Sequence, residues 1–186
     1  FTSDVTIKAG TVLGTSAAAN AFGAATGVIT LGDSDRGSNA ATLLVGTTGL
    51  TYANPIVLTS ATTGILTIGN AGTNISTSFS GGITGTNNLT INSNATTGTI
   101  TILTGAVDNA GTVTNIGAGP NTTTISAAVG SNVTAIIENS TTSALTVSGA
   151  VTVGAANKVF TNSGSALFTL SGGITGTGNL TFNANS

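Results

Sequence analysis

Only eight side chains of this 186-residue sequence are charged at neutral pH, and they are the first candidates for chemistry. Asp33, Asp35 and Arg36 lie together in one short segment, which is the only cluster of charged residues. Because Ca²⁺ prefers carboxylate oxygens, Asp33 and Asp35 are the candidates for a metal site. Two carboxylates are few, and the Gly-Gly-x-Gly-x-Asp repeat of calcium-binding coils is absent. We therefore expect a solvated turn with a local Asp–Arg ion pair and no bound metal.

The residue types that the sequence lacks exclude several kinds of active site. There is no His and no Cys, so the commonest general base, thiol nucleophiles, thiolate metal ligands and disulfides are all missing. Five acidic residues spread along the chain do not form the pair of carboxylates that glycoside hydrolysis needs. We predict that the chain is not an enzyme and that it binds no cofactor.

Composition also limits the partners. Three cationic residues cannot follow a phosphate backbone, so we expect no nucleic-acid binding. No apolar run approaches the roughly 18 residues of a membrane helix, so we expect no membrane insertion by this segment. The chain begins at Phe1 without a signal-peptide pattern, which suggests a processed product or an excised fragment. A mean hydropathy of +0.43 and 39% hydrophobic residues argue against disorder.

Short segments in which apolar residues alternate with Thr recur along the chain. Successive side chains of a strand point to opposite faces, so this alternation places the apolar residues inward and Thr outward. The clearest segments are 5–7, 29–31, 66–68, 89–91, 100–102, 145–147, 151–153 and 180–182. Gly, Asn and Ser separate them, as expected for turns. The pattern predicts an all-β fold.

A sequence repeat indicates which all-β fold this is. Residues 80–95 recur as 171–186 with 12 of 16 positions identical, at an offset of 171 − 80 = 91 residues. Four steps of about 23 residues make up this offset, and two series of apolar residues follow the shorter step. The first series is Ile68, Ile91, Val113, Ile136, Phe160 and Phe182, and the second is Phe79, Ile102, Ile125, Val147 and Leu170. This period predicts a parallel β-solenoid in which the two series stack as a hydrophobic spine.

The period also predicts the organisation of the chain. At about 23 residues per coil, 186 residues form about eight coils of a single solenoid segment. The coils should be regular over residues 58–186 and less regular over residues 1–57, where the repeat is blurred. An antiparallel sandwich is the alternative, but such folds favour Asn-Gly or Asp-Gly hairpin turns and the sequence has neither pair.

Hydroxyl side chains precede the second apolar series at the same step. We expect them to form an outward ladder of hydroxyl groups made of Ser78, Thr101, Thr124, Thr146 and Thr169. Flat Thr-x-Thr arrays on solenoids can bind ice, and residues 99–101 and 122–124 fit this pattern. The next two coils do not continue it, so we do not expect ice binding.

Glu138 and Lys158 form a second pair of candidate residues. Their separation in the sequence is close to the length of one coil, so they could be neighbours on adjacent coils. A Lys–Asn isopeptide crosslink assisted by Glu138 is one possibility. We favour a surface ion pair or two unrelated side chains.

Several segments resemble the passenger-associated β-strand repeat of bacterial autotransporters. The N-terminal match covers Val-Thr-Ile-Lys-Ala-Gly-Thr-Val-Leu-Gly at 5–14, Ala-Asn-Ala-Phe-Gly at 19–23 and Gly-Val-Ile-Thr-Leu-Gly-Asp at 27–33. Residues 83–91 and 174–182 are similar to the Gly-x-Gly-x-Leu strand of the same repeats. The resemblance implies a right-handed parallel β-helix on, or released from, a bacterial surface, although this chain carries less charge than most passengers.

These observations favour a structural role. The pattern shows no cap and stops within a strand motif, so we expect the open ends to pair head to tail with another copy or to continue within the same polypeptide. The expected function is a structural extracellular or cell-surface fibre of bacterial origin. The alternative is an adhesive passenger stalk, for which residues 33–38 and 52–55 are the candidate irregular features. A polysaccharide-active β-helix enzyme is the distant alternative.

Overall fold

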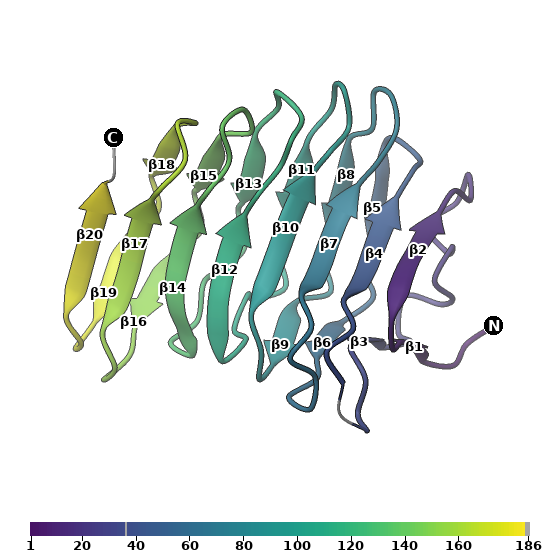
Figure 1. The fold of residues 1–186 in the computed structure, drawn as a ribbon, viewed down its shortest axis with the longest axis horizontal. Helices are drawn as coiled ribbons and strands as arrows, with labels where there is room; N and C mark the ends of the chain where they lie inside the picture. The colour runs from purple at the N-terminus through teal and green to yellow at the C-terminus, as the bar shows by residue number, and fades with distance from the viewer. Residues whose placement is uncertain (36, 185–186) are drawn as a thin grey trace.

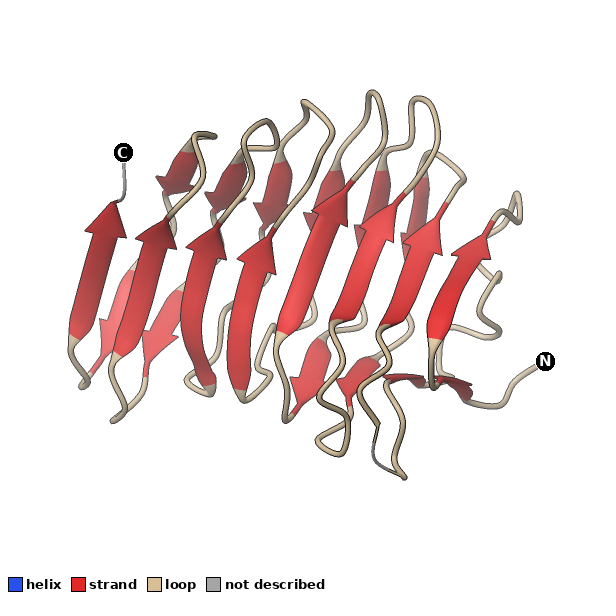
Figure 2. Ribbon diagram, in the orientation of Figure 1, coloured by secondary structure: helices blue, strands red, loops and turns tan. Residues whose placement is uncertain are grey.

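The computed structural model describes residues 1–35 and 37–184 as a stack of β-coils (Figure 1). The described residues form twenty strands and no helix (Figure 2). Every strand pairing is parallel. The predicted all-β parallel solenoid is therefore confirmed.

The largest sheet receives one strand from each coil, and its eight strands show that there are eight coils. We call it the long sheet. In order, its strands are β2 (Gly10–Gly14), β4 (Ala41–Val45), β7 (Leu66–Asn70), β10 (Leu89–Ser93), β12 (Gly111–Asn115), β14 (Val133–Glu138), β17 (Lys158–Asn162) and β20 (Leu180–Ala184).

Two further faces complete the cross-section. The second sheet contains β5 (Leu50–Tyr52), β8 (Thr77–Phe79), β11 (Ile100–Ile102), β13 (Thr123–Ile125), β15 (Leu145–Val147) and β18 (Phe168–Leu170). The third face contains β1 (Val5–Ile7), β3 (Ile29–Leu31), β6 (Ile56–Leu58) and β9 (Ile83–Gly85), then β16 (Val151–Val153) and β19 (Ile174–Gly176). Single parallel bridges at Val107 and Val129 connect β9 to β16, so this face is continuous.

The path of the chain defines the hand of the coil. In Figure 1 each strand of the long sheet runs upward at the front, and the chain then crosses at the top to the second sheet behind it. It returns along the bottom through the third face and advances to the left by one coil. This path makes a right-handed β-helix.

Coil length varies along the chain. In the long sheet Val12 pairs with Leu43 and Leu43 pairs with Ile68, so the first two steps are 43 − 12 = 31 and 68 − 43 = 25. The following steps are shorter, as in 91 − 68 = 23 for Ile68 and Ile91. The first coil is longer because residues 15–28 contain no strand and nine residues separate β3 from β4, and the second is longer because residues 59–65 separate β6 from β7.

The interior is filled by the alternating apolar residues. The second spine series pairs in register from Phe79 to Leu170, as the spacing predicts. Nine of the eleven spine side chains are buried; Leu170 is half-buried and Phe182 is 63% exposed. These two exceptions lie in the last coil, which has a neighbour on one side. Stacking one apolar residue on the next gives each coil the same favourable burial as the coil before it.

The register expected for the first spine series is wrong at one step. Ile91 pairs with Asn115, whereas Val113 pairs with Leu89. The reason is the corner between the second sheet and the third face, which spans 80–82 in one coil and 103–106 in the next. The longer corner lengthens the step by one residue, from 91 − 68 = 23 to 115 − 91 = 24, whereas the apolar series assumed a step of 113 − 91 = 22.

This shift places polar residues inside the solenoid. The inward row that begins with Leu43, Ile68 and Ile91 continues as Asn115, Glu138 and Asn162. Asn115 and Glu138 are fully buried. The spine is therefore apolar in one half of this row and polar in the other.

Candidate functional site

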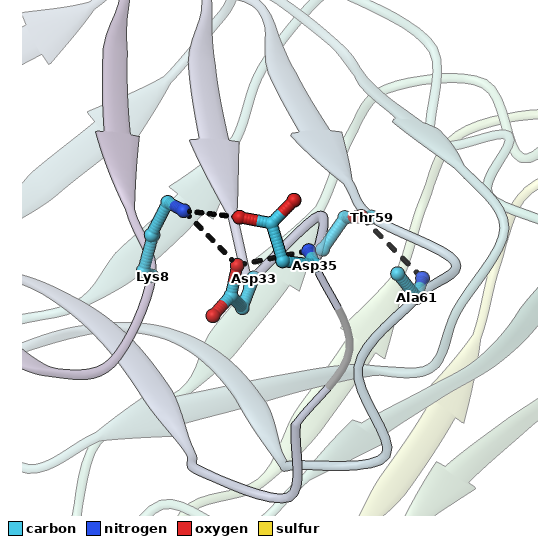
Figure 3. A network of polar contacts seen from close by, with 5 residues as sticks. All are labelled: Lys8, Asp33, Asp35, Thr59 and Ala61. Atoms are coloured by element: carbon cyan, nitrogen blue, oxygen red, sulfur yellow. Dashed lines mark hydrogen bonds and ion pairs between the residues drawn. The ribbon is translucent and has the colours of Figure 1, made fainter.

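The charged cluster lies at the corner between the third face and the long sheet (Figure 3). Lys8 Nζ lies 3.2 Å from Asp33 Oδ1 and 2.9 Å from Asp35 Oδ2. Asp35 N donates to Asp33 Oδ1 at 3.0 Å, which closes a tight turn. The cation between the two carboxylates is therefore the ammonium group of the preceding coil. Arg36, the partner expected from the sequence, lies outside the described residues.

These contacts explain the protonation behaviour of the cluster. Hydrogen bonds from Lys8 to Asp35 and Asp33 raise the pKa of the Lys8 amine. The backbone amide of Asp35 and the Lys8 ammonium hold the pKa of the Asp33 carboxyl below its usual value. In the described part of the chain, no three acidic side chains come together in a group that could hold a metal ion.

We expect removal of divalent cations to leave stability unchanged. The Lys8 ammonium already contacts both carboxylates, so a Ca²⁺ ion bound between them would have to displace it. Thermal unfolding followed by circular dichroism with and without EDTA measures this directly. A fall of many degrees in Tm with EDTA would show that a bound cation stabilises the fold.

The outward hydroxyl residues lie where the spacing places them. Ser78, Thr101, Thr124, Thr146 and Thr169 pair in register on the second sheet, and Thr51 extends the row by one coil. Within residues 1–35 and 37–184, no hydrogen bond joins the hydroxyls of this row. The row is thus an aligned, uncharged surface and not a bonded ladder.

Glu138 and Lys158 do not form a surface ion pair. Both side chains are buried, with exposures of 0% and 1%. Glu138 pairs with Asn162, four positions beyond Lys158 on β17, and no ion pair joins the two charges within the described residues. Of the two alternatives favoured from the sequence, the surface ion pair is wrong because both side chains point inward from the long sheet, and the two side chains are unrelated. The register partner of Glu138 lies four positions beyond Lys158 along β17, so Glu138 is not placed to assist an isopeptide reaction at Lys158.

The Lys158 side chain extends to the corner between the third face and the long sheet. Its Nζ donates to Gly130 O at 2.9 Å. Burial lowers the pKa of the Lys158 amine to about 8, and the nearby Asp108 carboxylate partly opposes this shift. The Gly130 carbonyl therefore holds the Lys158 amine in this corner.

The last coil presents an uncovered face. Each of β18, β19 and β20 has a strand neighbour on one side only, so a row of backbone groups is unpaired. Phe182, which belongs to an inward row, stacks on Phe160 with ring centroids 5.3 Å apart, yet it remains 63% exposed. Ile174 on β19 is also exposed. This C-terminal face, made of β18, β19 and β20, has the composition of an interior.

The first coil differs, because residues 15–27 take the place of a second-sheet strand and pack against β5 and Asn54 of the second coil. Phe22 is buried against Tyr52, with ring centroids 5.3 Å apart, and Asn54 Nδ2 donates to Ala24 O and Gly27 O at 2.8 and 2.9 Å. Tyr52 is itself buried, so it forms no exposed aromatic patch. The strands β1 and β2 keep a free edge. The expectation of no cap therefore needs correction at this end.

Two corners project beyond the regular coils beneath β4 and β7 (Figure 1). The connection from β6 to β7 spans residues 59–65, whereas that from β9 to β10 spans only 86–88. A shallow groove of about 230 Å³ lies beside it, lined mainly by Thr63, Ile65, Asn88, Thr90 and Thr112. Ile65 is 63% exposed. The groove is uncharged and opens on the outer surface of the long sheet.

The fold defines a β-solenoid repeat protein. Comparison of the chain with protein-family models, curated proteins and solved structures found no match. No helix in the described part of the chain is long and apolar enough to cross a membrane.

Proposed function

We propose that the chain is a structural rod segment of a bacterial surface or extracellular fibre, and that its C-terminal face stacks on the first coil of a second copy. The observation that carries this proposal is the in-register stacking of equivalent coils along the solenoid, in which β10 pairs with β7 on one side and with β12 on the other. A strand edge of this kind favours the addition of a further strand. The autotransporter-like repeats noted above support the proposed location.

The internal copy of the repeat supports stacking in parallel. Residues 80–93 have nearly the same sequence as 171–184, and their strands β9 and β10 pair with the following coil through Val107 and β12. The same side chains at the C-terminal face can accept a coil in the same way. Burial of the Phe182 ring alone would contribute about 1–2 kcal/mol per contact.

The shape of the first coil limits this contact. In a head-to-tail pair, β19 and β20 of one copy would continue onto β1 and β2 of the next. The second sheet begins at β5, so β18 would meet the irregular segment 15–27 and not a strand. Two of the three strand edges would therefore be extended.

Phe182→Asp is expected to abolish assembly without unfolding the chain, because it places a charge in the contact and leaves the inner coils unchanged. Negative-stain electron microscopy and light scattering over a range of concentrations measure this. We expect long filaments from the native chain and separate short rods from the variant.

Thr181→Asp is the matched control, since its side chain precedes Phe182 and points outward. It should keep the filaments. Short rods from the native chain at every concentration would contradict self-stacking and would assign the C-terminal face to a further coil of the same polypeptide.

An adhesive stalk is the second candidate function. The projecting corner 59–65 and the adjacent uncharged groove are the observation that favours it. Deleting residues 60–63 should leave assembly intact. Loss of binding to bacterial or host surfaces in that variant, with filaments preserved, would support adhesion over a purely structural role.

A further inference from the structure

The polar half of the interior row contains a carboxyl group without a neutralising charge. Glu138 Oε2 accepts from Asn115 Nδ2 at 2.8 Å, and Glu138 Oε1 accepts from the backbone amide of Ser140 at 2.6 Å. Its side chain is fully buried, as are Asn115 and Ser140. A carboxylate without water or a cation is costly in such a place.

The groups that face Glu138 from each neighbouring element are neutral. Asn115 comes from β12 and Asn162 from β17, in register on either side. Thr123 on β13 donates to Asn115 Oδ1 at 3.0 Å. The backbone oxygen of Ser143, in the turn between β14 and β15, accepts from Asn115 Nδ2 at 2.7 Å. Among the described residues these contacts include no cation. Lys158 is the nearest charge on β17, and its amine is engaged by Gly130 at the opposite corner.

In an earlier coil the corner between the long sheet and the second sheet is held by a neutral group. Asn70 Oδ1 accepts from the backbone amides of Asn94 and Ala95 at 2.9 and 3.1 Å, and Asn70 Nδ2 donates to Ile75 O. A neutral side chain is therefore sufficient to close a turn between the long sheet and the second sheet. Glu138 lies at this corner of a later coil, in register with Ile68 and two positions before the level of Asn70, and its carboxyl can gain or lose a proton.

We propose that Glu138 makes the solenoid proton-sensitive: it is uncharged when the coils built on β12, β14 and β17 are fully packed, and its ionisation loosens them. The solenoid is then more stable in mild acid than at neutral pH. This inference is independent of whether the chain assembles into a fibre.

The direction of the effect follows from the protonation of the two states. Burial raises the pKa of the Glu138 carboxyl, and the hydrogen bonds from Asn115 and Ser140 oppose only part of that shift. A carboxyl with a raised pKa in the folded state binds more protons there than when unfolded. Its contribution to stability is complete below the unfolded value of about 4.3 and is lost as pH rises through the folded value.

Two other groups limit the useful pH range. The pKa of the Asp33 carboxyl is lowered, so its ionised form stabilises the fold above about pH 4. This stabilisation is lost as pH falls, which is opposite to the dependence expected for Glu138. Lys158, with a pKa of about 8, adds its own dependence at higher pH. Between about pH 4.5 and 7 the dependence assigned to Glu138 is separated from both.

The test is a series of urea unfolding measurements from pH 4.5 to 7 at constant ionic strength. The folding equilibrium constant of the native chain should fall as pH rises, by at most about tenfold per pH unit for one proton. Glu138→Gln should remove this slope, whatever its absolute stability. Asp35→Asn, which changes an exposed carboxyl, is the control and should keep the slope.

A second measurement keeps the proposal testable if the Gln variant does not fold. Carboxyl carbon NMR of the native chain follows the titration of Glu138 directly. We expect its midpoint above that of an exposed Glu. A flat stability profile, an equal slope in the Gln variant, or a Glu138 midpoint at or below about 4.3 would each overturn the inference.

Discussion

Ile102→Asp is expected to leave the chain unfolded at 25 °C. Ile102 is buried in β11, where it stacks between Phe79 on β8 and Ile125 on β13. An aspartate there loses the apolar contact and must either ionise without solvent or take up a proton, and each alternative is costly. The loss should exceed about 4 kcal/mol, in the range that marks a buried charge in a packed core. Far-ultraviolet circular dichroism and thermal unfolding measure this outcome.

Thr101→Asp is the matched control, because Thr101 is the preceding residue of the same strand and faces outward. It introduces the same charge one position away, in a row that also contains Ser78 and Thr124. We expect it to fold, with a loss of less than about 1 kcal/mol. Equal losses in the two variants, or a native unfolding curve for Ile102→Asp, would contradict the inward assignment of the spine.

The coil period could be predicted from the sequence because stacking requires it. Each spine residue lies on the equivalent residue of the previous coil, so the apolar pattern has to return after every coil. The second series shows this clearly, with Phe79, Ile102 and Ile125 in register. Alternation with Thr then assigns the inward and outward faces.

The register of the long sheet could not be predicted from the apolar pattern alone. One additional residue in the corner 103–106 moves the following strand, and nothing in the hydrophobic series marks that insertion. A series with an apolar residue at every step places Val113 after Ile91, although Asn115 is the residue that pairs with Ile91. Val113 and Asn115 are two positions apart on one strand and face the same side, so alternation does not distinguish them.

The burial of three polar residues could not be predicted from the sequence either. Asn115, Glu138 and Lys158 have the residue types of turns and surfaces, and sequence averages place them there. Their interior positions depend on partners from other coils, such as Gly130 O for Lys158 and the Asn115 amide for Glu138. The useful signal is positional: in the true register Asn115 and Glu138 fall in line with Leu43 and Ile68.

The charged cluster shows the same limit at the surface. Sequence proximity indicated only Arg36 as a partner, and it did not indicate Lys8, which reaches Asp33 and Asp35 from the preceding coil. In a solenoid, residues about one coil apart are as close as residues adjacent in the chain. Candidate pairs should therefore be sought at the coil interval as well as locally.

Gly85→Ala is expected to destabilise the chain by about 3 kcal/mol or more, since it combines two separate costs. Gly85 has φ of +101°, a backbone conformation that is unfavourable for a residue with a Cβ atom. It also pairs with Leu58 of the previous coil, and an added Cβ would lie inside van der Waals contact with the Leu58 backbone oxygen and nitrogen. Backbone atoms cannot turn aside like a side chain, so the coils themselves would have to separate. Urea unfolding measures the loss.

Gly49→Ala separates the two costs. Gly49 has φ of +77°, but a Cβ atom built there meets no other atom within 4 Å. Its substitution should therefore cost only the conformational term, about 1–2 kcal/mol. If Gly85→Ala costs no more than Gly49→Ala, the close approach of successive coils at this corner is not what requires glycine. A larger loss at Gly85 would show that coil stacking, in addition to turn geometry, selects glycine here. It would also predict the same requirement at Gly176, the equivalent position of the repeat, where an added Cβ meets the backbone oxygen of Val153.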